Sequence, residues 1–193
     1  IFNAVAAPME AKLHNRNTGL DSVIQTSALT NYNIVVFDQA LKGRSYITFT
    51  NTNVVREGAE RDANVTGLDL ALYNKSNTHA LIATGRYSKI WSNNPYDGYN
   101  ATLRLAKVSG AWRYYALGNV ESKMYDPNDL GILFSANELS GRFNISYNKF
   151  TPTKNFIQYS FSLDNRIQYM YENTAFNRYD VTASAFWIFK NFW

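Results

Sequence analysis

The 193-residue sequence contains no cysteine, which excludes disulfide bonds, thiolate metal sites and a cysteine nucleophile. Its two histidines, His14 and His79, stand far apart, so no histidine-based metal site is expected. No apolar run approaches the roughly 20 residues of a membrane helix. The net charge of +4, from 19 basic and 15 acidic residues, is too small an excess to indicate a nucleic-acid partner. We therefore expect no cofactor, no metal ion and no nucleic acid.

The sequence is rich in residues that alternate between polar and apolar. Residues 139–148 read LSGRFNISYN, in which Leu139, Gly141, Phe143, Ile145 and Tyr147 alternate with polar residues. A strict period of two indicates a strand with one apolar and one polar face. The pattern recurs within 99–108, 111–123, 156–172 and 175–191, and less cleanly near 1–13, 30–41, 45–56, 64–73 and 78–91. Because aromatic residues make up 16% of the chain and favour strands, the sequence predicts about ten strands and no helix.

The apolar faces of these strands contact either a protein core or lipid. Several strands exceed the roughly 9–11 residues that a tilted membrane strand needs, whereas a typical globular strand has about 5–6. The polar faces carry too many charges for a dry core, but they suit a water-filled lumen. The candidate lumen-facing charges are Arg86, Arg104, Arg113, Glu121, Arg142, Asp164, Arg166, Arg178 and Asp180. They either line a pore or pair across neighbouring strands and plug it. A soluble β-sandwich alternates in the same way and is the competing interpretation.

The connections between the expected strands alternate in length. LKGR (41–44), NKSN (74–77), SG (109–110) and TPTKN (151–155) are short, whereas 14–30, 57–63, 92–98 and 124–138 are mostly longer. The exception is ENT (172–174), a short connection on the long-loop side. Outer-membrane barrels have short periplasmic turns and long external loops. We therefore predict an all-β, antiparallel, up-and-down transmembrane β-barrel, in which Trp91, Trp112 and Trp187 near strand ends are candidates for the aromatic girdles.

Both ends of the chain fall inside expected strands, at Ile1 and at Asn191–Trp193. We therefore expect residues 1–193 to be a segment of a single outer-membrane barrel domain in a longer polypeptide. An open barrel leaves two strand edges unsatisfied in lipid. The strands near 1–13 and 175–191 are accordingly expected not to pair with each other, and to pair instead with strands outside this sequence or with a partner chain.

Two charged motifs invite a chemical interpretation. DPND (126–129) places two aspartates beside an asparagine, but its spacing is not that of an EF-hand loop and Asp-Pro also makes an ordinary turn. We interpret DPND as turn or loop packing rather than a calcium site. REGAERD (56–62) clusters Arg56, Glu57, Glu60, Arg61 and Asp62, which we expect to be solvated rather than catalytic. No phosphate-binding, nucleophile-elbow or zinc-protease motif occurs, so the sequence supplies no catalytic constellation.

Three stretches, taken in order, resemble a known family. They are TNYNIVVFDQALKGRSYITFTNTNVVREG (30–58), RDANVTGLDLALYNKSNTHALIATG (61–85) and YDPNDLGIL (125–133). They are similar to the C-terminal β-barrel domain of unknown function of Bacteroidota outer-membrane proteins that carry an N-terminal family 9-like carbohydrate-binding domain. The resemblance runs over nearly the whole chain and implies a barrel-like domain in the outer membrane of a Gram-negative cell. It supplies no catalytic residues, and the carbohydrate-binding part of such proteins lies outside these residues.

These observations leave three hypotheses for the function. The first is an outer-membrane barrel that acts as a transport route, an anchor or a subunit of a cell-envelope assembly, with outer-membrane lipid and other outer-membrane proteins as partners. The second is a glycan-binding or glycan-processing surface protein whose sugar-binding domain lies outside this segment. The third is a soluble β-sandwich binding module. Nothing in the residues indicates an enzyme.

Overall fold

The computed structural model describes residues 1–191; Phe192 and Trp193, which the sequence analysis places in the last strand, lie outside the described residues. Within residues 1–191 the chain forms twelve β-strands and no helix. The strands are β1 (Phe2–Ala6), β2 (Met9–His14), β3 (Asp21–Ser27), β4 (Thr30–Ala40), β5 (Tyr46–Arg56), β6 (Asp62–Tyr73), β7 (His79–Trp91), β8 (Tyr96–Lys107), β9 (Trp112–Glu121), β10 (Glu138–Lys149), β11 (Phe156–Met170) and β12 (Phe176–Phe189). The predicted all-β class is confirmed. In the part of the chain that is described, no helix is long and apolar enough to cross a membrane.

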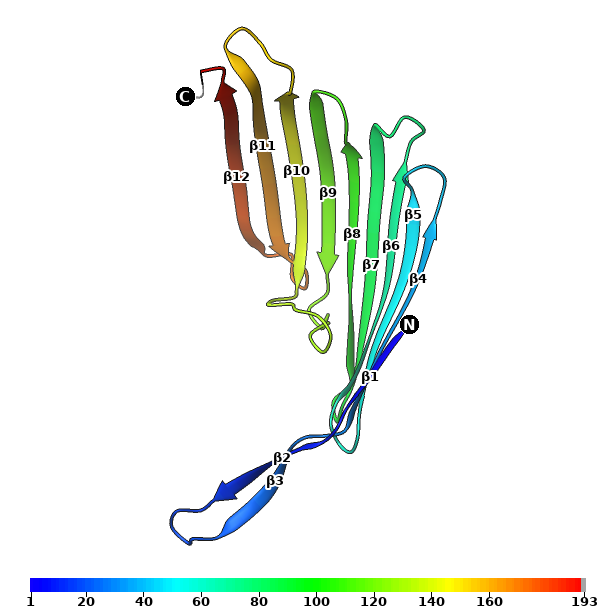
Figure 1. Cartoon of the computed structure of the whole chain (residues 1–193), viewed down its shortest axis with the longest axis vertical. Helices are drawn as coiled ribbons and strands as arrows, with labels where there is room; N and C mark the ends of the chain where they lie inside the picture. Colours follow the sequence, from blue (N-terminus) through cyan, green and yellow to red (C-terminus); the bar gives the residue numbers. More distant parts are fainter. Residues whose placement is uncertain (192–193) are drawn as a thin grey trace.

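Ten of the strands form one antiparallel sheet in the order β1-β4-β5-β6-β7-β8-β9-β10-β11-β12. From β4 onward each strand pairs with the next one along the chain, as predicted for an up-and-down arrangement. Figure 1 shows these strands as one tall, curved sheet. Its edge strands, β1 and β12, pair with β4 and β11 and not with each other, so the described residues form an open sheet rather than a closed barrel.

The segment predicted as one strand near 1–13 and a long loop over 14–30 forms three strands instead. β1 ends before Pro8, whose missing N–H cannot continue a ladder of hydrogen bonds. β2 and β3 then pair as a hairpin that projects away from the large sheet (Figure 1). Asn15 shapes its turn, because its Oδ1 accepts hydrogen bonds from the N–H groups of Asn17 and Thr18 at 2.9 and 3.2 Å. β3 escaped prediction because its apolar residues Val23 and Ile24 are adjacent and do not alternate.

Two connections that were expected to be long are short turns. β6 begins at Asp62 and β8 at Tyr96, which leaves only 57–61 and 92–95 between the strands. The expectation of long loops is therefore wrong for 57–63 and 92–98, whereas the connection 122–137 is long as predicted. The additional strand residues carry β4–β8 beyond the ends of β9–β12 (Figure 1). We call this side the extended end of the sheet and the opposite side the short-turn end.

The register of the strands sorts the side chains onto two faces of the large sheet. One cross-strand row pairs Phe37 with Phe49 and Phe49 with Leu68, and the face to which this row belongs is here called the apolar face. Its large side chains include Phe37, Phe49, Leu68, Leu103, Tyr114, Phe143, Phe161 and Val181, which are between 37% and 65% exposed. The opposite face carries most of the charged strand residues and is called the polar face. The alternation seen in the sequence thus separates the two faces in space.

The buried core is small: its largest side chains lie on the polar face at the extended end, and the buried alanines Ala71, Ala80 and Ala106 lie on the same face at the short-turn end. Val54, Ala63 and Ile90 are paired neighbours on β5, β6 and β7 and are at most 2% exposed. The accessible surface totals 13033 Å², whereas a compact soluble chain of 22.0 kDa exposes about 9,300 Å² by size scaling. The described chain therefore leaves about 3,700 Å² more surface uncovered than a self-contained globular domain would.

Candidate functional site

The loop 122–137 folds over the polar face at the extended end and is held there by four charged side chains. Arg56, the last residue of β5, and Arg61, just before β6, each donate an Nη2 hydrogen bond of 2.7 Å to Asp129. Arg61 also donates to Asp126, with an Nη1–Oδ2 distance of 3.2 Å. We call these four residues the Arg–Asp clasp. The Asp129 side chain is only 6% exposed, and ion pairs so far removed from water cost about 3–5 kcal/mol to break by removing one partner.

Neutral groups complete the surroundings of Asp126. The Tyr96 hydroxyl donates a hydrogen bond to Asp126 Oδ2 at 2.8 Å. The backbone N–H of Asp126 donates to the buried hydroxyl of Ser88 at 3.0 Å. Burial by itself raises the pKa of the Asp126 carboxyl. Hydrogen bonds from Asn128 and Tyr96, together with the charge of Arg61, outweigh that effect and lower the net pKa. Burial, and then the hydrogen bond to Asp126, raise the pKa of Tyr96, so this phenol remains a donor at neutral pH.

A glycine allows the loop to lie directly on the sheet. Gly98 in β8 lies beneath the backbone of Met124 and Tyr125, and an added Cβ would overlap these atoms. Next to it, the Tyr99 N–H donates to the Ser122 hydroxyl at 2.8 Å, at the point where the loop leaves β9. The closest approach of loop to sheet is therefore available to glycine alone at position 98.

The clasp joins the two charged motifs of the sequence across separations of 65 to 73 residues. DPND packs as a loop, as predicted: Asp126 Oδ1 accepts the Asn128 N–H at 3.0 Å in a local turn. The prediction that the REGAERD charges are solvated is wrong for Arg56 and Arg61, whose side chains are 19% and 39% exposed. Both arginines stand at strand ends on the polar face, where the returning loop covers them. No group of three or more potential metal-ligating side chains assembles within residues 1–191.

The nine candidate lumen-facing charges all lie on the polar face, as the register of β7 to β12 shows. Several are paired: Arg86 with Asp69 at 2.6 Å, Arg142 with Asp164 at 2.9 Å, Arg166 with Glu138 at 2.9 Å, and Arg178 with Asp180 at 3.0 Å. The first three pairs bridge adjacent strands, as one of the two sequence-based alternatives supposed. The fourth lies within β12.

The remaining three candidates have different surroundings. Glu121 accepts a hydrogen bond from the Asn100 amide at 3.2 Å. Arg113 lies over the ring of Phe150, 5.5 Å from its centroid. Arg104 lies 4.1 Å from the centroid of the Tyr115 ring, and its Nε is the one buried side-chain nitrogen or oxygen without a hydrogen-bond partner among the residues described.

Aromatic rings border the apolar face at two levels. At the short-turn end Trp112, Tyr147 and Tyr159 follow one another across β9, β10 and β11, with ring centroids 5.0 and 6.1 Å apart. Toward the extended end Tyr99 and Tyr171 meet edge to face at 6.0 Å, and their hydroxyls share a hydrogen bond. The large aliphatic side chains of the apolar face lie between these two borders.

The three tryptophans singled out from the sequence do not share one environment. Trp112 stands in the border row of the short-turn end, and Trp187 is paired there with Tyr159. Trp91 ends β7 beyond Lys89 at the extended end, outside the band of apolar side chains, and stands in neither aromatic border. Its place in a girdle therefore stays a prediction.

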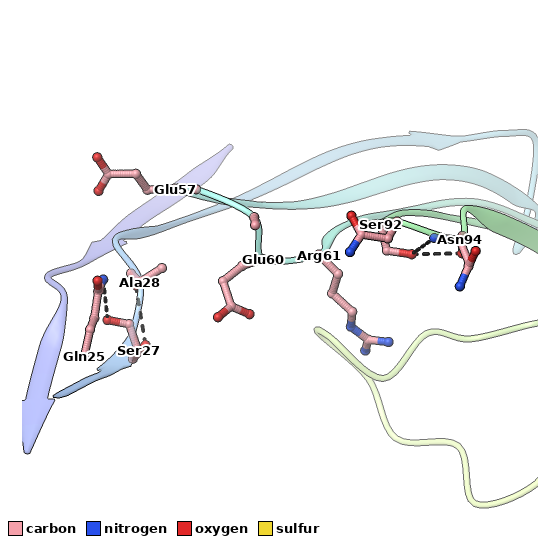
Figure 2. Close-up of a pocket in the computed structure, with 11 residues that line it drawn as sticks. Gln25, Ser27, Ala28, Glu57, Glu60, Arg61, Ser92 and Asn94 are labelled. Carbon is pink, nitrogen blue, oxygen red and sulfur yellow. Dashed lines mark hydrogen bonds between the residues drawn. The ribbon is translucent and has the colours of Figure 1, made fainter.

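A hollow of about 550 Å³ lies between the base of the β2–β3 hairpin and the turns 57–61 and 92–95. Figure 2 shows that the side chains of Glu57 and Glu60 point in different directions around it. The Ser92 hydroxyl donates a 2.9 Å hydrogen bond to the backbone carbonyl of Asn94 (Figure 2). The hollow therefore lacks the converging carboxylates of a general acid–base site.

Comparisons with curated proteins and with solved structures find no match to this chain. One family model matches it, over residues 1–193, and its description states no activity. Any function must accordingly be argued from the two faces of the sheet and from the loop clasped to it. The chain belongs to the family described as Domain of unknown function (DUF5916).

Proposed function

We propose that the chain forms part of the wall of a β-barrel in the outer membrane of a Gram-negative cell, with its apolar face toward lipid and its polar face toward an aqueous interior. The observation that carries this proposal is the apolar face, whose large side chains from β4 to β12 stay exposed. No strand among residues 1–191 packs against this face as a second layer. Exposed apolar patches far larger than about 300–600 Å² mark a surface that meets a membrane or a partner.

The height of the apolar band supports lipid as the partner. On β9 the band runs from Trp112 to Val120, and on the paired β10 from Tyr147 to Leu139. About nine residues, at roughly 3.4 Å each and a tilt of about 40°, span about 23 Å. The apolar band of outer-membrane barrels is about 25 Å tall and is flanked by aromatic girdles. The two aromatic borders described above lie where such girdles would be.

The open edges support a barrel larger than the sheet described. β12 presents one whole edge, Phe176–Phe189, and on the other side β1 covers only Thr30–Ile34 of β4, so residues 35–40 of β4 form the edge at the level of the apolar band. In hydrocarbon each unsatisfied backbone group costs several kcal/mol, so we propose that both edges pair with strands outside residues 1–191. Hydrogen exchange on the full-length protein tests this: the β12 amides should be protected on both edges. Fast exchange of every second β12 amide would contradict the pairing.

The charged side chains of the polar face favour a transport route for polar solutes over an anchor alone. An anchor needs only the lipid-facing side chains, whereas this sheet keeps charged groups along the whole opposite face from β5 to β12. The clasped loop 122–137 lies over that face and would narrow the opening at the extended end. Solute flux into vesicles that hold the full-length protein, compared with empty vesicles, measures whether a route exists.

Alternating accessibility is the most direct test of the membrane assignment. Single cysteines replace Phe143, Asn144, Ile145 and Ser146 in turn in the full-length protein, and each is spin-labelled in lipid vesicles. Labels at 143 and 145 should collide with oxygen, which concentrates in lipid, and labels at 144 and 146 with a water-soluble nickel complex. The alternating positions serve as matched controls, because they share one strand. Labels at 143 and 145 that neither reagent reaches would indicate a protein core.

The sides of the membrane can be tested with two protease-sensitive tags. The extended end should face outward, because the long connection lies there and external loops are the long ones in such barrels. A tag inserted between Ser135 and Ala136 should be cut on intact cells, whereas one between Ser109 and Gly110 should be cut only after lysis. The opposite pattern would reverse the orientation.

A further inference from the structure

Arg104 differs from the paired arginines of the polar face. Its Nε is buried and has no hydrogen-bond partner within residues 1–191. The guanidinium lies 4.1 Å from the centroid of the Tyr115 ring. Stacking on a ring favours the positive charge but satisfies none of the five N–H donors of the group. A buried charged donor without an acceptor is costly. The terminal Nη groups of Arg104 also make no hydrogen bond within residues 1–191, so the whole guanidinium lacks an acceptor from the described chain, and only these Nη groups can reach one outside it.

A second arginine approaches the same ring. Arg142 lies 5.9 Å from the Tyr115 centroid, so two guanidinium groups share one aromatic side chain. The register also places Arg104 on β8, Leu117 on β9 and Arg142 on β10 in one cross-strand row. Arg166 on β11 continues this row. From β7 to β12 this row has six residues, of which three are cationic and one, Asp180 beside Arg166 on β12, is a carboxylate.

Asp164, the carboxylate that binds Arg142 and Tyr115, makes no hydrogen bond or ion pair with Arg104. Both Asp164 oxygens accept the Nε of Arg142 at 2.9 Å. Asp164 also accepts the Asn144 amide at 3.1 Å and the Tyr115 hydroxyl at 3.3 Å. The Asp164 oxygens thus accept hydrogen bonds from residues of β9 and β10, whereas Arg104 lies on β8 and donates none to them. Arg142 bonds Asp164 through Nε, and its terminal Nη groups make no hydrogen bond within residues 1–191.

We propose that Arg104 and Arg142, on either side of Tyr115, form a binding site for an oxyanion carried by a solute in the barrel interior. A guanidinium presents a planar fork of N–H donors that matches the oxygens of a carboxylate, phosphate or sulfate group. The inference rests on the proposed function, because it requires the polar face to border water. It deepens that function by naming the solute class as anionic.

The test uses the full-length protein in detergent micelles, with inorganic phosphate and inorganic sulfate as probes in calorimetric titrations at low ionic strength. Arg104→Gln should weaken binding by about tenfold or more, because charge-assisted hydrogen bonds are lost. Arg104→Lys keeps the charge but not the fork and should weaken binding less. The matched control is Arg178→Gln, which removes the same charge from the same face at a residue paired with Asp180 at 3.0 Å. It should leave the affinity unchanged.

Several outcomes would overturn the site. They are no binding of either anion by the folded wild type, equal losses in Arg104→Gln and Arg178→Gln, and a full-length structure in which a carboxylate from another strand pairs with Arg104. Failure of the membrane proposal itself would be recognised separately, from spin labels at 143 and 145 that oxygen cannot reach. The two failures are therefore distinguishable.

Discussion

Replacing Asp129 by Asn is the sharpest perturbation of the clasp, because it removes one charge and hardly any volume. The Asp129 carboxylate accepts 2.7 Å hydrogen bonds from both Arg56 and Arg61, and its side chain is 6% exposed. Breaking a buried ion pair by removing one partner costs about 3–5 kcal/mol. The Arg61 side chain is 39% exposed and keeps Asp126, so we expect the lower limit of that range, about 3 kcal/mol. That loss raises the population of the undocked loop about a hundredfold.

Hydrogen exchange in the full-length protein measures this population, because amides of the loop that exchange only on undocking should do so about a hundredfold faster. The matched control is Glu172→Gln, which breaks the ion pair between Glu172 and Lys123, a residue at the start of the same loop. Its side chains are 57% and 58% exposed, and such surface pairs contribute about 0–1 kcal/mol. Similar exchange rates in the Asp129 and Glu172 variants would refute the assignment of the clasp as the element that holds the loop.

Three further outcomes are expected. Gly98→Ala should lift the loop and speed its exchange, whereas Gly118→Ala, where an added Cβ meets open space, should not. Phe143→Arg should cost about 2–4 kcal/mol in urea unfolding from lipid vesicles if it lies near the midplane, and Asn144→Arg should be mild; equal costs would indicate a soluble core. The pKa of Asp126 is lower in the folded state, so its stabilisation of the docked loop is complete above the ordinary carboxyl value of about 3.9 and is lost as the pH falls through the folded pKa. Protection factors of the loop amides, which correct for the intrinsic pH dependence of exchange, should fall at strongly acidic pH, and unchanged protection factors would contradict this coupling.

The sequence alone predicted the strands and their two faces best where the pattern was local. In 139–148 a period of two fixes which side chains share a face, whatever lies beyond the sheet. The same reasoning placed Arg104 and Arg142 on one face correctly. It could not decide which charges pair, because Arg142 and Asp164 meet through the register of two strands and a one-residue slip would separate them.

The clasp was beyond local reasoning for a different reason. Arg56 and Asp129 are separated by 73 residues, and each lies in a motif that is an ordinary charged turn by itself. One signal could have joined them: two arginines and two aspartates stand at strand ends on the same side of an up-and-down sheet, so their charges are complementary and close. The length of the connection at 57–61 was overestimated, because an aspartate such as Asp62 is typical of loops. Its carboxylate instead accepts the Arg56 N–H at 2.7 Å and closes the ladder between β5 and β6.

The polarity of the apolar face changes along the strands, and this change favours lipid over a protein core as the proposed contact of that face. A sandwich needs a core face that stays apolar along each strand. On the apolar face here, the row of Phe37, Phe49 and Leu68 gives way within a few residues to a row of Asn33, Asn53, Asn64, Lys89 and Asp97, all paired across β4 to β8. At that same level the polarity of the opposite face also changes, because that face holds the buried apolar residues Val54, Ala63 and Ile90 beneath the clasped loop. A boundary that crosses five strands along one register row, with aromatic rings beside it, is the pattern that the proposed lipid contact predicts, and a packed protein layer does not require it. Under the proposed function the extended end would stand clear of the membrane, where an outward face is polar and an inward face can form a core of its own.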